Sequence, residues 1–132
     1  MLRYVDLKSG QNDAGPAWIA RVKISRSGGT VYFNGKALKR RGGIYSNHVD
    51  LETGDEYWVS GIKKDGTDRH WAGSGKVAIE KSAVSEYLEL VGKQALDQSR
   101  LVIIDDLPDT DIQRFVELEN ELGSARNNEE LS

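Results

Sequence analysis

The distribution of glycine constrains the fold of this chain more than any other feature of its sequence. Twelve of the 14 glycines precede residue 76, and only two follow it. Glycine tolerates the positive φ angles that tight turns require, and it is unfavourable inside helices. We therefore expect the first part of the chain to consist of short strands joined by turns, and the last part to be helical.

Sequence patterns within the first 80 residues predict the strands. Residues 18–25 alternate between apolar and polar side chains, which is typical of a strand with one buried face. Glycine-containing turns are predicted at residues 27–29, 34–35 and 53–55. The expected strands cover residues 18–25, 30–33, 36–39, 44–51, 56–63 and 76–79. Five to seven short antiparallel strands at this spacing indicate a small antiparallel β-barrel or curled sheet over residues 2–80.

Helical periodicity begins after this region. Apolar side chains at i, i+3, i+4 and i+7 predict an amphipathic helix over 83–91, with Ser82 as its N-cap and an end near Gly92. A second, broken stripe predicts a helix over 109–122 that ends at Gly123. Between the two, the aliphatic run 101–104 is expected to be a buried strand, although its short length leaves a helical turn open.

These elements define the expected fold class and domain limits. The prediction is a single α+β domain over residues 1–123, β-rich over 2–80 and helical over 82–123, in which one or two C-terminal helices cover the sheet. The acidic segment 124–132 is expected to be a disordered tail.

Composition narrows the function classes. The 132 residues include no cysteine and two histidines, which excludes disulfides and thiolate chemistry and argues against a closed zinc site. We predict neither a metal nor a cofactor. The sequence has no apolar run of about 20 residues and no apolar signal region, so we expect no membrane association and a cytoplasmic location.

Charge is unevenly distributed along the chain. Residues 21–81 contain 12 basic and 7 acidic side chains, whereas the remainder contains 6 basic and 14 acidic ones. Guanidinium, ammonium and flat aromatic groups together can hold phosphates and stack bases. The candidate binding residues of the basic segment are Lys63, Lys64, Arg69, His70, Trp71 and Lys76, and the neighbouring Lys36, Lys39, Arg40 and Arg41 extend the same surface.

The leading functional hypothesis is a non-enzymatic binding module that contacts nucleic acid, another polyanion or an acidic protein through this surface. The alternative for each part is structural. Lys63 and Lys64 would then be a solvated hairpin tip, Trp71 would fill the core, and the cations at 36–41 would protect an exposed strand edge.

Catalysis is the second hypothesis. His48, His70 and Lys63 are residue types that a small metal-independent ribonuclease or phosphoesterase would use, because imidazole titrates near neutrality.

Two other patterns give weaker signals. The segment 72–76 lacks the first glycine and the final Ser or Thr of a phosphate-binding loop, and the carboxylates at 50–56 lack the ligand spacing of a calcium loop and resemble a solvated acidic turn.

The third hypothesis is a structural or regulatory interaction domain. A protein of this kind would pair through an edge strand or through the acidic C-terminal helix, either with another protein or with a second copy of itself. A homo-oligomer therefore remains an open alternative.

Four segments resemble a family of small, functionally uncharacterised bacterial proteins: GPAWI at 15–19, TVYFNGK at 30–36, ETGDEYWVSG at 52–61 and DGTDRHWAGSGK at 65–76. The resemblance covers roughly residues 2–92. Some members carry the name of 1-deoxy-D-xylulose-5-phosphate synthase, a thiamine-diphosphate enzyme. Such an enzyme requires a much longer chain with a diphosphate-and-magnesium motif, which is absent here, so the resemblance implies no catalytic residue.

Overall fold

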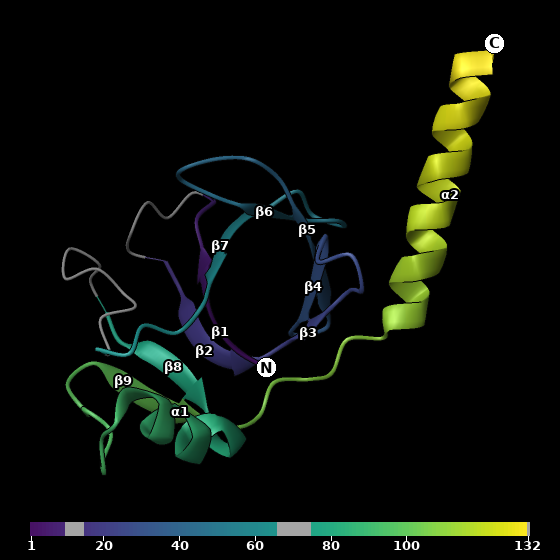
Figure 1. Ribbon diagram of the computed structural model, residues 1–132. Coiled ribbons are helices and arrows are strands. Elements are labelled where there is room, and N and C mark those ends of the chain that lie inside the picture. Colours follow the sequence, from purple (N-terminus) through teal and green to yellow (C-terminus); the bar gives the residue numbers. More distant parts are fainter. Residues whose placement is uncertain (10–14, 66–74, 132) are drawn as a thin grey trace.

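The computed structural model describes residues 1–9, 15–65 and 75–131, with side chains described as far as residue 122. It shows an α+β fold built on one mixed, curled sheet (Figure 1). The sheet order is β3-β4-β5-β6-β7-β1-β2-β8-β9. In chain order the elements are β1 (Leu2–Leu7), β2 (Ala17–Arg21), β3 (Lys23–Ile24), β4 (Thr30–Phe33), β5 (Lys36–Arg40), β6 (His48–Asp50), β7 (Glu56–Ser60), β8 (Val77–Glu80), a 3₁₀ turn η1 (Lys81–Ala83), α1 (Val84–Val91), β9 (Leu101–Ile104) and α2 (Ile112–Leu131).

The curl arises because β2 and β3 are consecutive parts of one bent segment. Only Val22 separates them, yet β2 pairs with β1 while β3 pairs with β4. The Val22 amide donates a hydrogen bond to the Met1 carbonyl oxygen at the bend (2.9 Å). The strands from β3 to β2 therefore surround a common interior, as Figure 1 shows, and the predicted curled sheet is confirmed.

Turn chemistry accounts for the hairpins. Asn34 and Gly35 have φ angles of 51° and 72°, as the two-residue turn between β4 and β5 requires. Gly28 (78°) and Gly54 (77°) adopt the same region in the turns before β4 and before β7. The hairpins predicted at all three turns are confirmed.

The expectation of a purely antiparallel sheet is wrong. β8 pairs in parallel with β2, and β9 pairs in parallel with β8. Parallel neighbours need a crossover connection. Between β8 and β9 this connection contains α1 and the loop after it.

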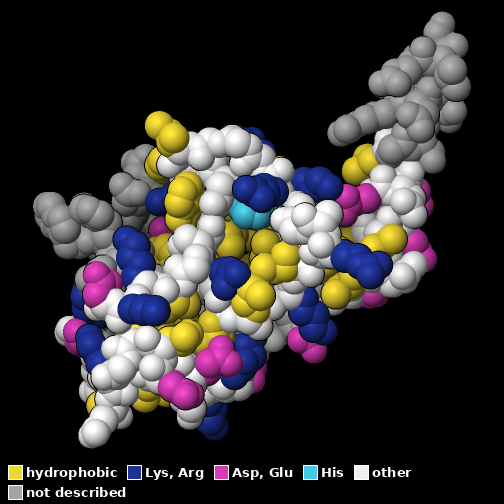
Figure 2. All heavy atoms as spheres, viewed as in Figure 1, with side chains coloured by type: hydrophobic (Ala, Val, Ile, Leu, Met, Phe, Trp, Pro, Cys, Tyr) yellow, Lys and Arg dark blue, Asp and Glu magenta, His cyan; other side chains and the backbone are white. Residues whose placement is uncertain are grey.

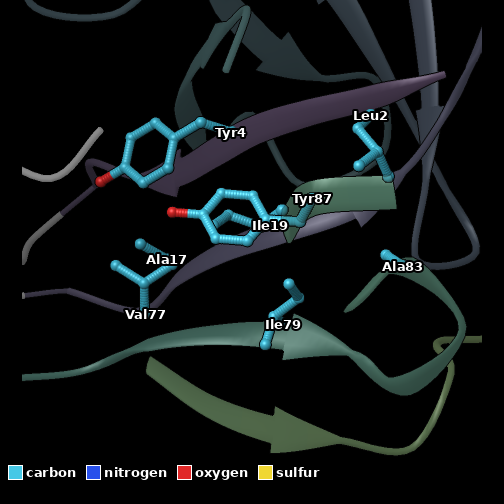
Figure 3. Close-up of a cluster of buried hydrophobic side chains, with 8 residues drawn as sticks. All are labelled: Leu2, Tyr4, Ala17, Ile19, Val77, Ile79, Ala83 and Tyr87. Atoms are coloured by element: carbon cyan, nitrogen blue, oxygen red, sulfur yellow. The ribbon is translucent and has the colours of Figure 1, made fainter. Parts of the chain in front are cut away.

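Among the described residues, three hydrophobic clusters hold the fold together. Alternate side chains of the curled strands fill the interior: Val5, Ala20, Val22, Val31, Phe33, Leu38, Tyr57 and Val59. On the opposite face, Ala83 of η1 and Tyr87 of α1 pack against side chains of β1, β2 and β8 (Figure 3). These strand residues are Leu2, Tyr4, Ala17, Ile19, Val77 and Ile79. Under the start of α2, the third cluster contains Tyr32, Ala37 and Phe115.

The first helix begins differently from the prediction. Ser82 does not cap α1, because it lies inside η1, where the chain turns directly out of β8. Its amide donates a hydrogen bond to Asp106 Oδ1 (2.9 Å) in the segment that follows β9. The predicted end is confirmed, since Gly92 adopts the left-handed conformation that commonly terminates a helix.

The strand predicted at 101–104 is present as β9, but it is not buried. It is the last strand of the sheet order, and Val102 and Ile103 keep 44% and 53% of their surface exposed. Its aliphatic composition predicted a buried strand. This prediction is wrong because β9 lies at the edge of the sheet, where one side has no neighbouring strand among the described residues.

The second helix begins at Ile112 and does not end at Gly123. It continues to Leu131 and projects away from the sheet (Figure 1). A glycine inside a helix costs only about 1 kcal/mol relative to alanine, so Gly123 alone does not end a helix among helix-forming neighbours. The domain limit at residue 123 and the disorder of 124–132 stay predictions.

Candidate functional site

A groove lies where β5 leaves the sheet. The Arg40 amide donates a hydrogen bond to the Gly29 carbonyl oxygen (2.8 Å), and the Arg41 amide donates one to the Asn47 carbonyl oxygen (2.9 Å). These bonds hold the turn before β4 and the loop after β5 around an open volume of about 710 Å³. Its lining is Ser27, Gly28, Gly29, Lys39, Arg40, Arg41, Gly42, Gly43, Asn47 and Trp58.

The groove is strongly basic. It is lined by three consecutive cations, Lys39, Arg40 and Arg41, and by no carboxylate among the described residues. On the face that Figure 2 shows, Lys and Arg side chains are spread around hydrophobic side chains in the opening of the curl. A cluster of one sign on a concave surface attracts ions of the opposite charge.

The three cations differ in their partners. Lys39 Nζ lies 2.9 Å from Glu119 Oε2 of α2, and Arg41 pairs with Glu56. These side chains are about one third to one half exposed, so both pairs are weak. Arg40 makes no ion pair within the described part of the chain, and its charge is available to a ligand.

Trp58 and Asn47 form the rigid side of the groove. Trp58 is half-buried against the cluster beneath α1. The Asn47 amide is fixed by two bonds to the backbone of Val59: Nδ2 donates to the carbonyl oxygen, and Oδ1 accepts from the amide, both at 2.8 Å. The groove therefore combines exposed cations with a half-buried aromatic side chain and a hydrogen-bonded amide.

Asn47 also determines the tautomer of His48. Because the Val59 amide donates to Asn47 Oδ1, that oxygen is an acceptor, and His48 Nδ1 at 2.8 Å must donate to it. Nε2 then carries the lone pair in the neutral ring. Burial, and next the charge of Arg40 opposite it in the β5–β6 pair, lower the pKa of His48 below 6.5.

Tyr57 lies opposite His48 on β7 and is also uncharged. Burial, together with Asp50 and Asp55, raises the pKa of Tyr57 to about 12. At neutral pH the row Arg40, His48 and Tyr57 therefore contains one cation and two neutral hydrogen-bonding groups.

The lowered pKa of His48 predicts a loss of stability in acid. The unfolded chain binds a proton near pH 6.5, whereas the folded chain binds it only at lower pH. The stabilising contribution of the neutral ring is complete above the unfolded-state pKa of about 6.5 and is lost as the pH falls through the folded-state pKa. Thermal melts should give a lower midpoint at about pH 5 than at about pH 7, and His48→Gln should reduce this difference. An unchanged difference in the variant would exclude His48 as its source.

The predicted binding residues do not all line this groove. Arg40 and Arg41 do, and so does Lys39. Arg40 is level with Tyr57, near the start of β7, whereas the exposed Lys63 and Lys64 follow the end of that strand. Lys76 precedes β8 and is not part of the lining, and Lys36 lies 3.4 Å from Asp50 instead. Arg69, His70 and Trp71 lie outside the described residues, so their roles stay predictions.

Sequence reasoning missed Asn47, Trp58 and the turn at 27–29 as groove residues. For Asn47 and Trp58 the sequence did contain a signal. The hairpin around the turn at 53–55 places these two residues opposite each other when its strands pair with His48 opposite Tyr57. That pairing is known only from the structure. No local sequence pattern indicates that the turn at 27–29 approaches β5.

The acidic segment 50–56 forms a structural turn. Asp50 is buried, and its Oδ1 accepts hydrogen bonds from the amides of Glu52 (2.8 Å) and Thr53 (3.3 Å). The prediction of a solvated acidic turn is therefore wrong for Asp50. Within residues 1–9, 15–65 and 75–131, no three His, Asp or Glu among the side chains that the structure describes are grouped to hold a metal ion. In the same ranges no helix has the length and apolarity to cross a membrane.

Comparisons with protein-family models, curated proteins and solved structures gave no match. The family resemblance therefore stays a prediction.

Proposed function

We propose that the protein is a non-enzymatic binding module that holds a polyanion, with single-stranded nucleic acid as the first candidate, in the groove beside Arg40. The observation that carries the proposal is the lining itself: three consecutive cations and a half-buried tryptophan, without a carboxylate among the described residues. Phosphate contacts supply most of the affinity in non-specific nucleic-acid binding, and aromatic side chains add base stacking.

The partners of the cations support a polymeric anion over a single small one. A phosphate chain can engage Arg40 directly and can displace Glu56 from Arg41 and Glu119 from Lys39 at neighbouring phosphates. Each displaced pair is partly exposed and therefore weak. The fixed Trp58 and Asn47 would then contact the bases.

Replacing Arg40 by alanine tests the proposal. Arg40→Ala should weaken binding of a labelled single-stranded oligonucleotide about tenfold at low salt and reduce the slope of log affinity against log salt by about one. The thermal midpoint should change little, because Arg40 makes no ion pair among the described residues. Fluorescence anisotropy at low and moderate salt measures the affinity and its salt dependence, and a thermal melt measures the midpoint.

Lys93→Ala is the matched control, because Lys93 is exposed after α1 and outside the groove lining. It removes the same charge and should have a much smaller effect. Equal losses in the two variants would contradict a groove-specific contact. Tighter binding of an acidic polypeptide would assign the groove to acidic proteins, and cleavage of the oligonucleotide that His48→Gln abolishes would favour the phosphoesterase alternative.

A further inference from the structure

The outer edge of β9 has hydrogen-bonding groups without a strand partner in the described part of the chain. β9 is the last strand of the sheet, and Figure 1 shows it at the outer margin beyond β8. The Arg100 carbonyl oxygen accepts a hydrogen bond from the Val77 amide (2.8 Å). Because backbone groups alternate in direction along a strand, residues 102 and 104 also turn toward β8. The backbone groups of Ile103 and the carbonyl oxygen of Leu101 therefore point outward.

This edge lacks the features that usually prevent strand pairing. Natural edge strands carry charges, prolines or bulges that block the approach of another chain. The sequence of β9 is Leu-Val-Ile-Ile, with no charged residue and no proline. Val102 and Ile103, which point to opposite faces, are 44% and 53% exposed. An added strand would cover apolar surface on both faces.

The charges that flank β9 specify the partner. Arg100 precedes the strand, and Asp105 and Asp106 follow it, all exposed. If a second β9 paired with it in antiparallel orientation, Arg100 of each copy would lie near the aspartates of the other copy. We propose that β9 pairs antiparallel with β9 of a second copy of this chain and joins the two sheets into one. This inference is independent of the groove and its ligand.

The register of the pairing follows from the outward groups. Two antiparallel strands bond through their outward residues, so an odd-numbered residue of one copy must face an odd-numbered residue of the other. With Ile103 opposite Ile103 of the second copy, Arg100 faces the second copy's Asp106 across a close, non-hydrogen-bonded pair. With Val102 opposite Val102, Arg100 would face Ile104. The ion pairs therefore select the first register.

Sedimentation velocity from low to high micromolar concentration tests the dimer. The wild-type mass should rise toward twice the 14.7 kDa of one chain. Ile103→Pro removes an outward amide and leaves the bonds to β8 intact, so this variant should stay monomeric with a nearly unchanged thermal midpoint. Val102→Pro removes an amide that points at β8 and should instead lower the midpoint.

A charge exchange tests the register without proline. Arg100→Glu should weaken dimerisation about tenfold, because it places like charges at both ends of the pair. Arg100→Glu combined with Asp106→Lys should restore it. Because Asp106 Oδ1 also accepts the bond from the Ser82 amide (2.9 Å), Asp106→Lys alone is measured beside the double variant, and it should weaken dimerisation as Arg100→Glu does. Val116→Lys, on the exposed side of α2, should leave the dimer unchanged. A monomer at every concentration, or a dimer that resists Ile103→Pro or is lost in Val116→Lys, would overturn the proposal.

Discussion

Replacing Glu80 by alanine is expected to lower the free energy of unfolding by about 3 kcal/mol, because hydrogen bonds to a charged group contribute about 1.5–3 kcal/mol each. The buried Glu80 carboxylate accepts two backbone hydrogen bonds. Oε1 binds the Arg21 amide (2.7 Å), and Oε2 binds the Leu107 amide (2.9 Å). The substitution leaves both amides without this acceptor at the point where β2, β8 and the segment after β9 meet.

Urea unfolding followed by circular dichroism measures this loss. Glu80→Gln keeps one acceptor oxygen but turns an NH₂ group toward the other amide, so we expect an intermediate effect. Glu86→Ala is the matched control, since Glu86 is a partly exposed carboxylate that pairs with the Arg21 side chain (3.3 Å), and its loss should cost less than about 1 kcal/mol. Similar effects for Glu80→Ala and Glu86→Ala would show that the buried bonds do not stabilise the fold.

Replacing Phe115 by alanine is expected to release α2 from the sheet. Phe115 is fully buried against Tyr32 and Ala37, and truncating a buried phenylalanine costs about 3–5 kcal/mol. Ile112 and Leu118 of α2 pack against the same cluster but are only partly buried. Polar contacts add to them: the Lys39–Glu119 pair, and the bond from Thr110 Oγ1, just before the helix, to the Lys36 carbonyl oxygen (3.0 Å). They cannot replace this fully buried contact, and most of the stability of a helix in a protein comes from its tertiary packing.

Amide hydrogen exchange distinguishes release of the helix from unfolding of the domain. Amides of α2 should exchange about a hundredfold faster in Phe115→Ala, while amides of β1 and β2 should keep their protection. Val116→Ala, at the exposed neighbouring position, should change neither. Equal acceleration throughout the sheet would mean that α2 is part of the global core instead of a separately docked element.

Local chemistry made the hairpins predictable. Asn34 and Gly35 specify a turn through their own backbone preferences, and Gly28 and Gly54 do the same, so no distant contact was needed to find them. The alternation of residues 18–25 likewise indicated which side chains face the interior, although the bend at Val22 divides that segment into β2 and β3.

The errors concern contacts between distant segments. The parallel pairing of β8 with β2 joins residues 18–19 to residues 78–79, which are far apart in the sequence, and no turn residue encodes it. Glu80 binds amides at positions 21 and 107, which no periodicity could reveal. The aliphatic composition of β9 suggested burial, because sequence does not distinguish a central strand from an edge that a second chain could cover.

The candidate site was only partly predictable, because some of its residues come together through strand pairing. Arg40 and Arg41 were recognised by composition, as an extension of the basic segment. Asn47 and Trp58 become groove residues only when the β5, β6 and β7 registers are known. The emphasis on residues 63–76 came from side-chain type alone, and sequence could not show that Lys63 and Lys64 follow the end of β7 farthest from Arg40.

Mapping the bound oligonucleotide by NMR tests the central claim most directly. In a ¹H–¹⁵N correlation spectrum of the full chain, titration at low salt should shift the amides of residues 27–29, 39–43 and 47 and the indole signal of Trp58. Arg40→Ala should reduce these shifts, and added salt should reverse them, since the contacts are with phosphate. Shifts confined to residues 63–76, or none at low salt, would contradict the groove as the binding site.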